Sequence, residues 1–174
     1  MNGPHVILRA MEPDDLDHLY RWENHTDHWK TGNTLAPFSR HQLERFIESS
    51  QDIYALRQLR LMIDEKEDCG IRQAIGCIDL YDFDPGSRRA GVGILIGEPS
   101  MRKMGRASES LALLMEYVRE HLHMHQLHAS IDAENTASMR LFQKLGFEIS
   151  GCRKEWNLCN GNWSDEYVLQ YIFR

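Results

Sequence analysis

The residues between Ile94 and Leu114 combine an apolar run, a basic turn and the start of an amphipathic segment, ILIGEPSMRKMGRASESLALL. The turn carries three cations, which are Arg102, Lys103 and Arg106. A helix that begins near Gly105 points its unpaired N–H groups and the positive end of its dipole into the same space. Because glycine has no side chain, a ligand can approach the backbone closely there. We therefore predict that this turn binds a nucleotide-like polyphosphate.

An ordinary turn with solvated basic side chains is the alternative, because a glycine before a helix is common and short motifs often occur without a ligand. Two familiar phosphate-binding patterns, G-x-x-x-x-G-K-[ST] and G-x-G-x-x-G, do not occur in the sequence. The prediction of a polyphosphate site therefore needs support from a second motif.

Two motifs in order resemble the GNAT superfamily of N-acetyltransferases. The spacing Arg102-x-x-Gly105-x-Ala107 after an apolar strand is similar to the family's acyl-CoA pyrophosphate loop, [Q/R]-x-x-G-x-[G/A]. The segment from Asn135 to Phe147, NTASMRLFQKLGF, is similar to the family's N-x-x-[SA]-x-x-[LIV]-[YF]-x-K-x-G-F. The resemblance extends more loosely from residue 6 to residue 174. It points to the branch that contains ribosomal-protein and spermidine acetyltransferases.

The resemblance implies that acetyl-CoA is the co-substrate and indicates which residues bind it. The backbone of residues 95–97 would pair with the pantetheine arm in the manner of an added strand, and residues 102–108 would hold the pyrophosphate. Asn135 and its helix would flank the other side of the arm. The residues assigned to acetyl-CoA are Leu95, Ile96, Gly97, Arg102, Lys103, Met104, Gly105, Arg106, Ala107, Ser108, Asn135, Phe142 and Lys144.

Acyl transfer from a thioester to an amine needs a neutral amine, an N–H for the oxyanion and a proton for the thiolate that leaves. Many members of the family have a tyrosine in the second motif where this chain has Phe142, and phenylalanine has no proton to give. We expect Phe142 to be an aromatic residue of the core. The proton would then come from water, from another tyrosine such as Tyr81, or from no particular group.

Two carboxylates are candidates for the base that takes a proton from the acceptor amine through water. Asp79 matches an acidic residue of the spermidine-acetylating relatives, and Glu98 follows the strand that leads to the basic turn. Either could instead be an ordinary surface acid, since most surface acids are not catalytic. Strand alternation predicts that Asp79 faces the cleft on the same side as three neighbours, namely Ile75, Cys77 and Tyr81, with Ile78 and Leu80 on the other side.

The order of the expected elements predicts an α/β fold with a mixed, mostly antiparallel sheet of about seven strands and about four helices. Strands are expected at 6–9, 59–63, 74–81, 90–97, 127–133, 147–156 and 167–173. Helices are expected from 12, from 39, after 105 and from 135 to 146, with a loop at 25–37 and a hairpin turn near 160–162. Three glycines, Gly91, Gly93 and Gly97, indicate a bulge or the close approach of another backbone in the strand at 90–97. In the resembling family a bulge there splays two strands at the centre of the sheet.

Composition places the chain among ordinary globular proteins, with 174 residues, 42% hydrophobic and 26% charged residues. We expect one domain over residues 1–174, without a transmembrane segment or a signal peptide. The four cysteines have no C-x-x-C spacing, which favours a reducing cytoplasm over a disulfide framework or a zinc site. Four histidines near the end of the long helix lack ligands at suitable spacing, so no metal site is expected: His121, His123, His125 and His128.

The formal charge of −6 and the pI near 5.8 favour a cationic partner over nucleic acid. By resemblance, the chain would move the acetyl group of acetyl-CoA to a primary amine by direct transfer in a ternary complex. The amine would belong to a polyamine-like small molecule or to a protein amino terminus. Because the phenol is missing at Phe142, a non-catalytic acyl-CoA-binding or regulatory module is the alternative. The sequence leaves assembly into a homo-oligomer open.

Overall fold

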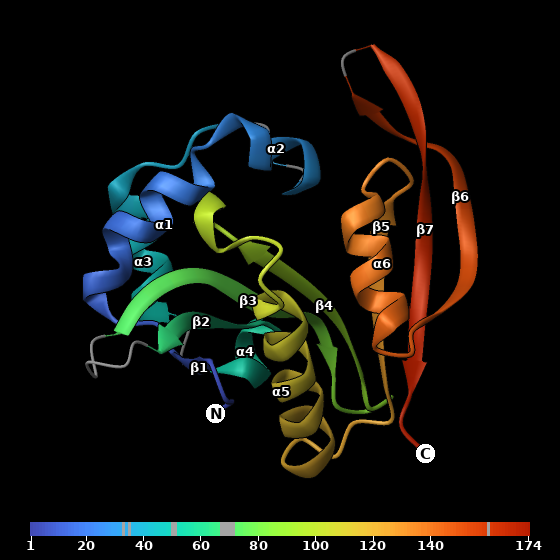
Figure 1. Cartoon of the computed structure of the whole chain (residues 1–174), viewed down its shortest axis with the longest axis horizontal. Coiled ribbons are helices and arrows are strands. Elements are labelled where there is room, and N and C mark those ends of the chain that lie inside the picture. Colours follow the sequence, from blue (N-terminus) through green and yellow to red (C-terminus); the bar gives the residue numbers. More distant parts are fainter. Residues whose placement is uncertain (33, 35, 50–51, 67–71, 160) are drawn as a thin grey trace.

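The computed structural model describes the whole chain except residues 33, 35, 50–51, 67–71 and 160 (Figure 1). A single sheet of seven strands runs through the described part in the order β1-β2-β3-β4-β5-β7-β6. The strands are β1 (Val6–Ala10), β2 (Leu59–Lys66), β3 (Arg72–Asp84), β4 (Arg89–Ile96), β5 (Gln126–Asp132), β6 (Glu148–Cys159) and β7 (Asn162–Ile172). The α-helices are α1 (Leu16–Glu23), α2 (Thr26–Gly32), α3 (Arg40–Ser49), α4 (Ile53–Leu56), α5 (Arg106–Glu120) and α6 (Thr136–Lys144). Two short 3₁₀ turns, η1 (Pro13–Asp15) and η2 (Pro99–Met101), complete the elements.

The expected splay lies between β4 and β5, which form the only parallel pair of strands in the described sheet. Their pairing covers only residues 89–91 of β4 and residues 126–128 of β5. Beyond Gly91 and His128 the two strands separate, and each remains paired only on its outer side, with β3 or with β7. The mixed, mostly antiparallel sheet with a central opening is therefore confirmed (Figure 1).

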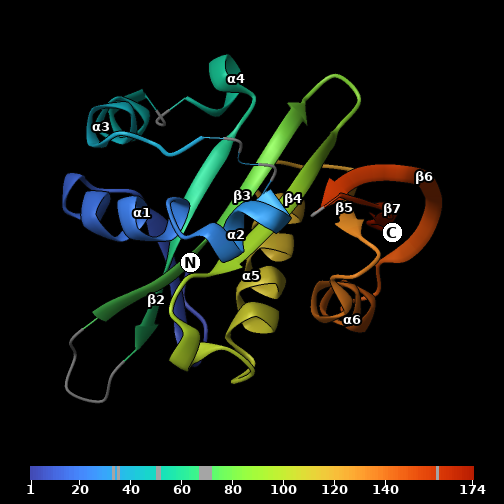
Figure 2. The same ribbon diagram turned by 90° about the horizontal axis from the view of Figure 1, so that it is seen from above.

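Helices cover both faces of the half of the sheet that β1 to β4 form (Figure 2). The apolar stripe of α5 packs on one face, because leucines and other apolar residues recur there at helical spacing: Leu111, Leu114, Met115 and Val118. A second, smaller core on the opposite face joins α1 and α3 to β2 and β3 through Leu19, Trp22, Leu43 and Ile47. The splay thus has one face beside α5 and another face toward α1. We call the second the acceptor face, because the candidate base Asp79 alternates with Cys77 on that side of β3.

Six α-helices are described where about four were expected, and the expected loop at 25–37 contains α2. Two of the helices depend on polar contacts that hydrophobic spacing does not reveal. The Nε1 atom of Trp29 in α2 donates to the Glu23 carbonyl at 2.7 Å. Asp52 caps α4 by accepting from the backbone N–H groups of Tyr54 and Ala55 at 2.9 and 3.0 Å.

The predicted alternation in β3 is wrong for Ile75. Ile63 of β2 lies opposite Gly76, whereas Asp64 lies opposite Ala74, so Ile75 is the extra residue of a bulge. A bulge shifts the alternation by one residue, and Ile75 consequently packs in the core under α5 with Ile78 and Leu80. Cys77 packs in the core beside α1 and α3, as expected.

The strand irregularity expected among the glycines lies instead in β3. Tyr81 pairs with Gly91 and Asp84 pairs with Arg89, so β3 contains the extra residue, and Asp82 there has a φ of 49°. Gly91 of β4 makes room for an aromatic ring rather than for another backbone. A Cβ at Gly91 would come within 2.2 Å of the Tyr81 ring.

Candidate active site

The turn between β4 and α5 opens onto free space at the helix start. Gly105 is the N-cap of α5 with a φ of 81°, and Lys103 also has a positive φ, of 63°. A Cβ built on Gly105 meets no heavy atom of the described residues within 4 Å. The first intrahelical bond runs from the Glu109 N–H to the Gly105 carbonyl, so the N–H groups before Glu109 have no partner within the helix. These groups are suited to bind an anion.

Arg102 ties this turn to two other elements of the site. Its Nε donates to the carbonyl oxygen of Ile96 at 3.1 Å, and its Nη2 lies 2.8 Å from Nε2 of His28 in α2. The Nδ1 atom of His28 lies 2.8 Å from the Trp22 carbonyl oxygen, which requires a proton on Nδ1 and leaves Nε2 as an acceptor. Arg102 therefore connects the turn to the end of β4 and to the acceptor face.

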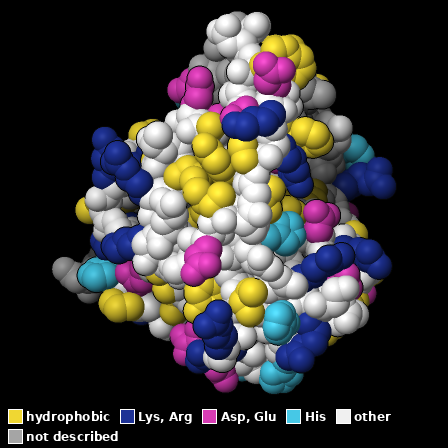
Figure 3. Space-filling view, turned by 90° about the vertical axis from the view of Figure 1, so that its right-hand side faces the viewer, with side chains coloured by type: hydrophobic (Ala, Val, Ile, Leu, Met, Phe, Trp, Pro, Cys, Tyr) yellow, Lys and Arg dark blue, Asp and Glu magenta, His cyan; other side chains and the backbone are white. Residues whose placement is uncertain are grey.

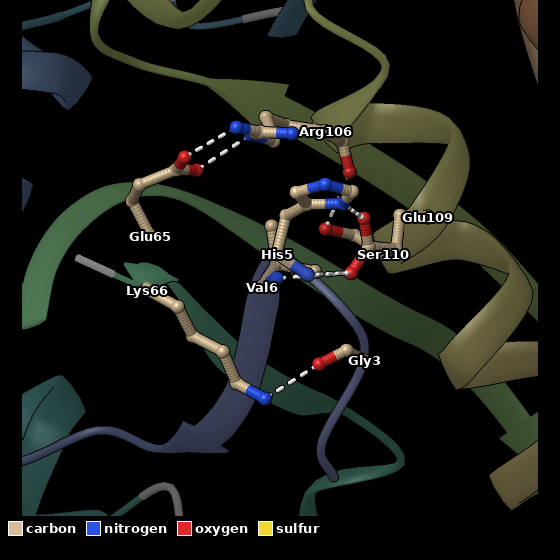
Figure 4. A network of polar contacts seen from close by, with 8 residues as sticks. All are labelled: Gly3, His5, Val6, Glu65, Lys66, Arg106, Glu109 and Ser110. Atoms are coloured by element: carbon tan, nitrogen blue, oxygen red, sulfur yellow. Dashed lines mark hydrogen bonds and ion pairs between the residues drawn. The ribbon is translucent and has the colours of Figure 1, made fainter. Parts of the chain in front are cut away.

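Arg106 does not offer its charge to the turn. Its guanidinium forms a two-pronged ion pair with Glu65 of β2, with Nε 2.6 Å from Oε2, and both side chains are largely buried (Figure 4). A neutralised guanidinium held by a carboxylate is a poor phosphate ligand. Among the described residues of this turn, the exposed cations are Arg102 and Lys103. Arg106 adds only its backbone N–H to the unpaired donors at the start of α5.

Glu109 anchors the first turn of α5 to the start of β1, a contact that sequence reasoning missed. Its carboxylate accepts from the backbone N–H groups of His5 and Val6 at 2.7 and 2.9 Å and lies 3.0 Å from Nδ1 of His5 (Figure 4). Burial of the carboxylate raises the pKa of Glu109, but the hydrogen bonds from His5 and Val6 lower it by more. The pKa of Glu109 therefore lies below its ordinary value. Ser110 also donates to the Arg106 carbonyl at 2.8 Å. These contacts hold the start of the helix against β1.

Of the three strand residues predicted to pair with pantetheine, Ile96 has its backbone directed to the splay. The N–H groups of Gly97 and Glu98 both donate to the Ile75 carbonyl of β3, at 2.9 and 3.1 Å. Strand geometry alternates, so Leu95 and Gly97 direct their peptide groups to β3, whereas Ile94 and Ile96 direct theirs to the opening. The Ile96 carbonyl accepts from Arg102 on that side, which agrees with this assignment.

Glu98 is held by two residues of α1 at the mouth of the acceptor face. Its Oε1 accepts from Trp22 Nε1 at 3.2 Å and from the guanidinium of Arg21. The Trp22 ring packs against Gly97, where a Cβ would come within 2.4 Å of ring atoms. Any side chain at position 97 would therefore collide with the Trp22 ring of α1.

Asp79 also lies on the acceptor face, in an ion pair that the sequence did not reveal. Both of its oxygens accept from Arg60 of β2, at 2.7 and 3.0 Å, and Arg60 donates in addition to Glu23 of α1. Burial alone would lower the pKa of Arg60, but the two carboxylates raise it well above its ordinary value. Burial raises the pKa of the nearby Cys77 thiol to about 12, so that thiol is not a nucleophile at neutral pH. The register places Arg60 directly opposite Asp79, which is the signal that could have found this pair.

The second sequence motif positions α6 beside β5 on the other side of the splay (Figure 1). The Oδ1 atom of Asn135 accepts from the Ser138 N–H at 3.2 Å and caps the helix. Phe142 is 2% exposed and packs edge-on against Phe147 with ring centroids 5.0 Å apart, which confirms its place in the core. Lys144 is exposed in the last turn of α6.

Tyr81 lies where the splay begins, beside Gly91 of β4 and His128 of β5. Burial raises the pKa of the phenol, whose oxygen accepts from the backbone N–H of Ser130.

Within the described residues, no group of three or more His, Cys, Asp or Glu side chains could hold a metal ion. In the same part of the chain, no helix is long and apolar enough to span a bilayer.

The model of the acetyltransferase (GNAT) domain family matches residues 5–148, which include the turn, the splay and both motifs. The chain belongs to the GNAT acetyltransferases. As a member of this family it is an acetyl-CoA-dependent N-acetyltransferase. The open helix start and the free edge of β4 fit the pyrophosphate and the pantetheine arm of that donor.

Individual GNAT proteins are similar to the chain over most of its length. The uncharacterized N-acetyltransferase p20 of Bacillus licheniformis is 28% identical over 171 residues, 97% of the chain and 93% of that protein. The spermidine N(1)-acetyltransferase of Escherichia coli K12 is 25% identical over 150 residues, 84% of the chain and 74% of that enzyme. A spermidine N-acetyltransferase structure from Vibrio cholerae, in complex with CoA and spermine, has a TM-score of 0.87 at 20% identity. It covers 98% of the chain and 96% of its own. This last likeness shows a shared fold.

Proposed function

We propose that this GNAT enzyme acetylates a primary amine of a polyamine-like small molecule, by direct transfer from acetyl-CoA in a ternary complex. The observation that carries the proposal is the joint geometry of turn and splay. The N-terminus of α5 opens onto free space at the end of β4, and the pairing of β4 with β5 stops at Gly91. The pyrophosphate of acetyl-CoA would lie on residues 102–108, with Arg102 and Lys103 supplying charge and Ile96 pairing with the arm.

The acceptor would enter from the face that contains α1, because carboxylates gather there. Glu23, Asp79 and Glu98 come from α1, β3 and the end of β4. Arg60 pairs with both Glu23 and Asp79 but neutralises only one of the two charges. Arg21 neutralises Glu98. Three carboxylates and two arginines therefore leave one net negative charge among these five side chains. A negative site attracts a cationic amine. The spermidine acetyltransferases among the relatives support the same class of acceptor.

Asp79 and Glu98 remain our candidates for the base. Each already accepts hydrogen bonds from an arginine, so each would take the proton of the ammonium through water rather than directly. The carboxylate that matters is the one whose removal lowers the rate without lowering the affinity for acetyl-CoA.

We further propose that residues 1–174 work as one domain in the cytoplasm, as an assembly of several copies. One continuous sheet from β1 to β7 supports the single domain. A spermidine N-acetyltransferase from Vibrio cholerae with this fold is dodecameric. Hydrophobic side chains gather in the upper half of the surface that Figure 3 faces. Three residues toward the end of the β6–β7 hairpin are more than half exposed, namely Trp156, Leu158 and Trp163. Such side chains commonly mark an interface.

Release of free CoA thiol in the presence of single acceptors tests the reaction. The panel contains spermidine, spermine, an aminoglycoside and a peptide with a free amino terminus. We expect the polyamines to give the highest kcat/KM. A protein that binds acetyl-CoA in calorimetry but releases no thiol with any acceptor would be a binding module instead. Preference for the peptide would move the acceptor class to protein amino termini.

A further inference from the structure

Tyr81 occupies a position of its own at the vertex of the splay. It pairs with Gly91, the last residue of β4 that pairs with β5. Its neighbours on alternate positions of β3, Cys77 and Asp79, lie on the acceptor face, and the alternation places Tyr81 there as well. On β5, Leu127 and Ala129 belong to the core under α5, so the residue between them, His128, also faces the acceptor side.

The Tyr81 ring crosses from β3 over β4 to β5. A Cβ on Gly91 would come within 2.2 to 2.6 Å of its ring carbons, and a Cβ on Gly93 would lie 3.9 Å from Cε1. The ring meets His128 of β5 edge-on, with centroids 5.7 Å apart and planes at 89°. At the far end, the phenol oxygen accepts from the backbone N–H of Ser130, the second residue after β4 and β5 part. The hydroxyl therefore lies at the start of the opening.

The contacts of the phenol leave its proton available. The Ser130 N–H occupies a lone pair of the oxygen, while the hydroxyl hydrogen has no acceptor among the described residues and can be donated. Burial, together with the charges of Asp82 and Glu166, keeps the pKa of Tyr81 above its ordinary value, although the Ser130 N–H and the charge of Arg153 act in the opposite direction. Burial lowers the pKa of His128, so the neighbouring imidazole is neutral at pH 7. The phenol is thus protonated in the working range of pH.

The direction of the donor brings the thioester to this end of the splay. The pyrophosphate turn follows the carboxyl end of β4, and the thioester is at the opposite end of the pantetheine arm. An arm that pairs with Ile96 and continues along β4 therefore runs toward Gly91 and Tyr81. Phe142, the aromatic residue of the second motif, is buried and has no proton to supply.

We propose that Tyr81 is the catalytic residue that gives its hydroxyl proton to the CoA sulfur when the tetrahedral intermediate collapses. This inference rests on the proposed position of the arm in the splay. The amine nitrogen first forms a bond to the thioester carbon. The C–S bond then breaks with its electron pair on sulfur, and the Tyr81 proton forms the thiol. The proton that leaves the nitrogen passes to water, and water returns a proton to the phenolate, so the reaction balances.

The substitution Tyr81→Phe tests this role, because it keeps the ring over Gly91 and removes only the hydroxyl. We expect kcat with the best acceptor to fall at least tenfold while the KM for acetyl-CoA stays within twofold. The matched control is Tyr117→Phe, which removes a half-buried hydroxyl from α5, away from the splay. The control should keep the wild-type kcat. Equal kcat for Tyr81→Phe and wild type would overturn the proposal.

A readout on bound product separates proton donation from packing. A donor beside sulfur stabilises the thiolate, so the ultraviolet thiolate band of bound CoA should appear at lower pH in wild type than in Tyr81→Phe. If kcat falls but this titration does not move, the hydroxyl acts only through the Ser130 contact and the proposal is wrong.

A second variant keeps the test valid if Tyr81→Phe does not fold. Incorporation of 3,5-difluorotyrosine at position 81 retains the ring and the hydroxyl but makes the phenol more acidic. The basic limb of the kcat profile should then move to lower pH, and an unmoved limb would overturn the proposal. Nearby charged groups do not change between the two proteins: Asp79 and Asp82 on β3, Arg89 on β4, His128 on β5, Arg153 on β6 and Glu166 on β7. Wild type that releases no thiol with any acceptor would instead refute the proposed function, because the protein would then be a binding module.

Discussion

Asp79 has a structural role that is separate from its proposed role as the base. Its carboxylate holds Arg60, which is largely buried between Asp79 and Glu23 and lies over the Phe46 ring. A buried guanidinium that loses a partner is costly, because the remaining charge is poorly solvated. The residue is therefore part of the scaffold of the acceptor face, whether or not it acts as the base.

The substitution Asp79→Asn should lower the acceptor-dependent rate at least tenfold, which corresponds to about 1.4 kcal/mol of transition-state stabilisation. The loss should be larger at low pH, where more of the acceptor amine is charged. The affinity for acetyl-CoA should not change. The free energy of unfolding should fall by about 1–3 kcal/mol, because Arg60 then keeps a single carboxylate.

Rates from pH 6 to 9 with the best acceptor, and urea unfolding, check this prediction. Asp165→Asn is the matched control, since Asp165 of β7 forms its ion pair with Lys154 of β6, within the terminal hairpin. The control should leave the rate and the affinity unchanged. Wild-type rates across this pH range for Asp79→Asn would move the assignment of the base to Glu98 or to no side chain.

The turn between β4 and α5 is the element on which we propose that donor binding depends. Gly105 has a φ of 81° and faces open space, so a branched side chain would strain the backbone and enter the volume assigned to phosphate. We expect Gly105→Val to weaken acetyl-CoA binding at least tenfold in calorimetry. Gly161→Val is the matched control, because Gly161 has a φ of 80° and equally open surroundings in the terminal hairpin. If both variants fold and both retain wild-type affinity, the pyrophosphate does not bind on this turn.

The link between α5 and β1 should depend on pH. The pKa of Glu109 is lowered in the fold, so its carboxylate contributes stability that is complete above its ordinary value of 4.5. This contribution is lost as the pH falls through the lower, folded value. We expect Glu109→Gln to lower the free energy of unfolding by about 1 kcal/mol at pH 7. The difference from wild type should shrink as the pH falls below 4.5.

Chemical unfolding at several pH values measures this difference. Glu116→Gln, at an exposed site of the same helix, serves as the control and should match wild type throughout. If the free energy of unfolding of Glu109→Gln stays below that of wild type by the same amount down to pH 3, the ionised carboxylate is not what stabilises the contact.

Local patterns predicted the elements proposed to hold the donor, because their signals lie within a few residues of one another. The turn before α5 and the cap of α6 at Asn135 are of this kind. Long-range pairs were not predictable in the same way. Arg106 meets Glu65 only when α5 packs on the sheet, and Arg60 meets Asp79 only when strand register places them opposite each other. The bulge at Ile75 likewise belongs to the register between β2 and β3.

At the scale of the whole molecule, two parts of the sheet meet at a narrow junction. Strands β4 and β5 share three residue pairs, after which they separate. The side with α5 carries the turn proposed to bind pyrophosphate, whereas the side with α6 flanks the opening (Figure 1). A donor that binds between the two sides would replace strand pairing that the protein lacks, so its effect should be confined to the splay and the turn.

Acetyl-CoA should therefore slow amide hydrogen exchange at Ile94 and Ile96, whose N–H groups point into the opening. It should change Gly97 little, because that N–H already donates to the Ile75 carbonyl at 2.9 Å. At a concentration of 100 times Kd, binding should also raise the free energy of unfolding by about 2.7 kcal/mol. Residue-resolved exchange with and without acetyl-CoA checks the pattern, and the hairpin around Trp163 serves as an internal control. Protection that is equal at Gly97 and Ile96, or that extends evenly to the hairpin, would mean that the arm does not pair with the free edge of β4.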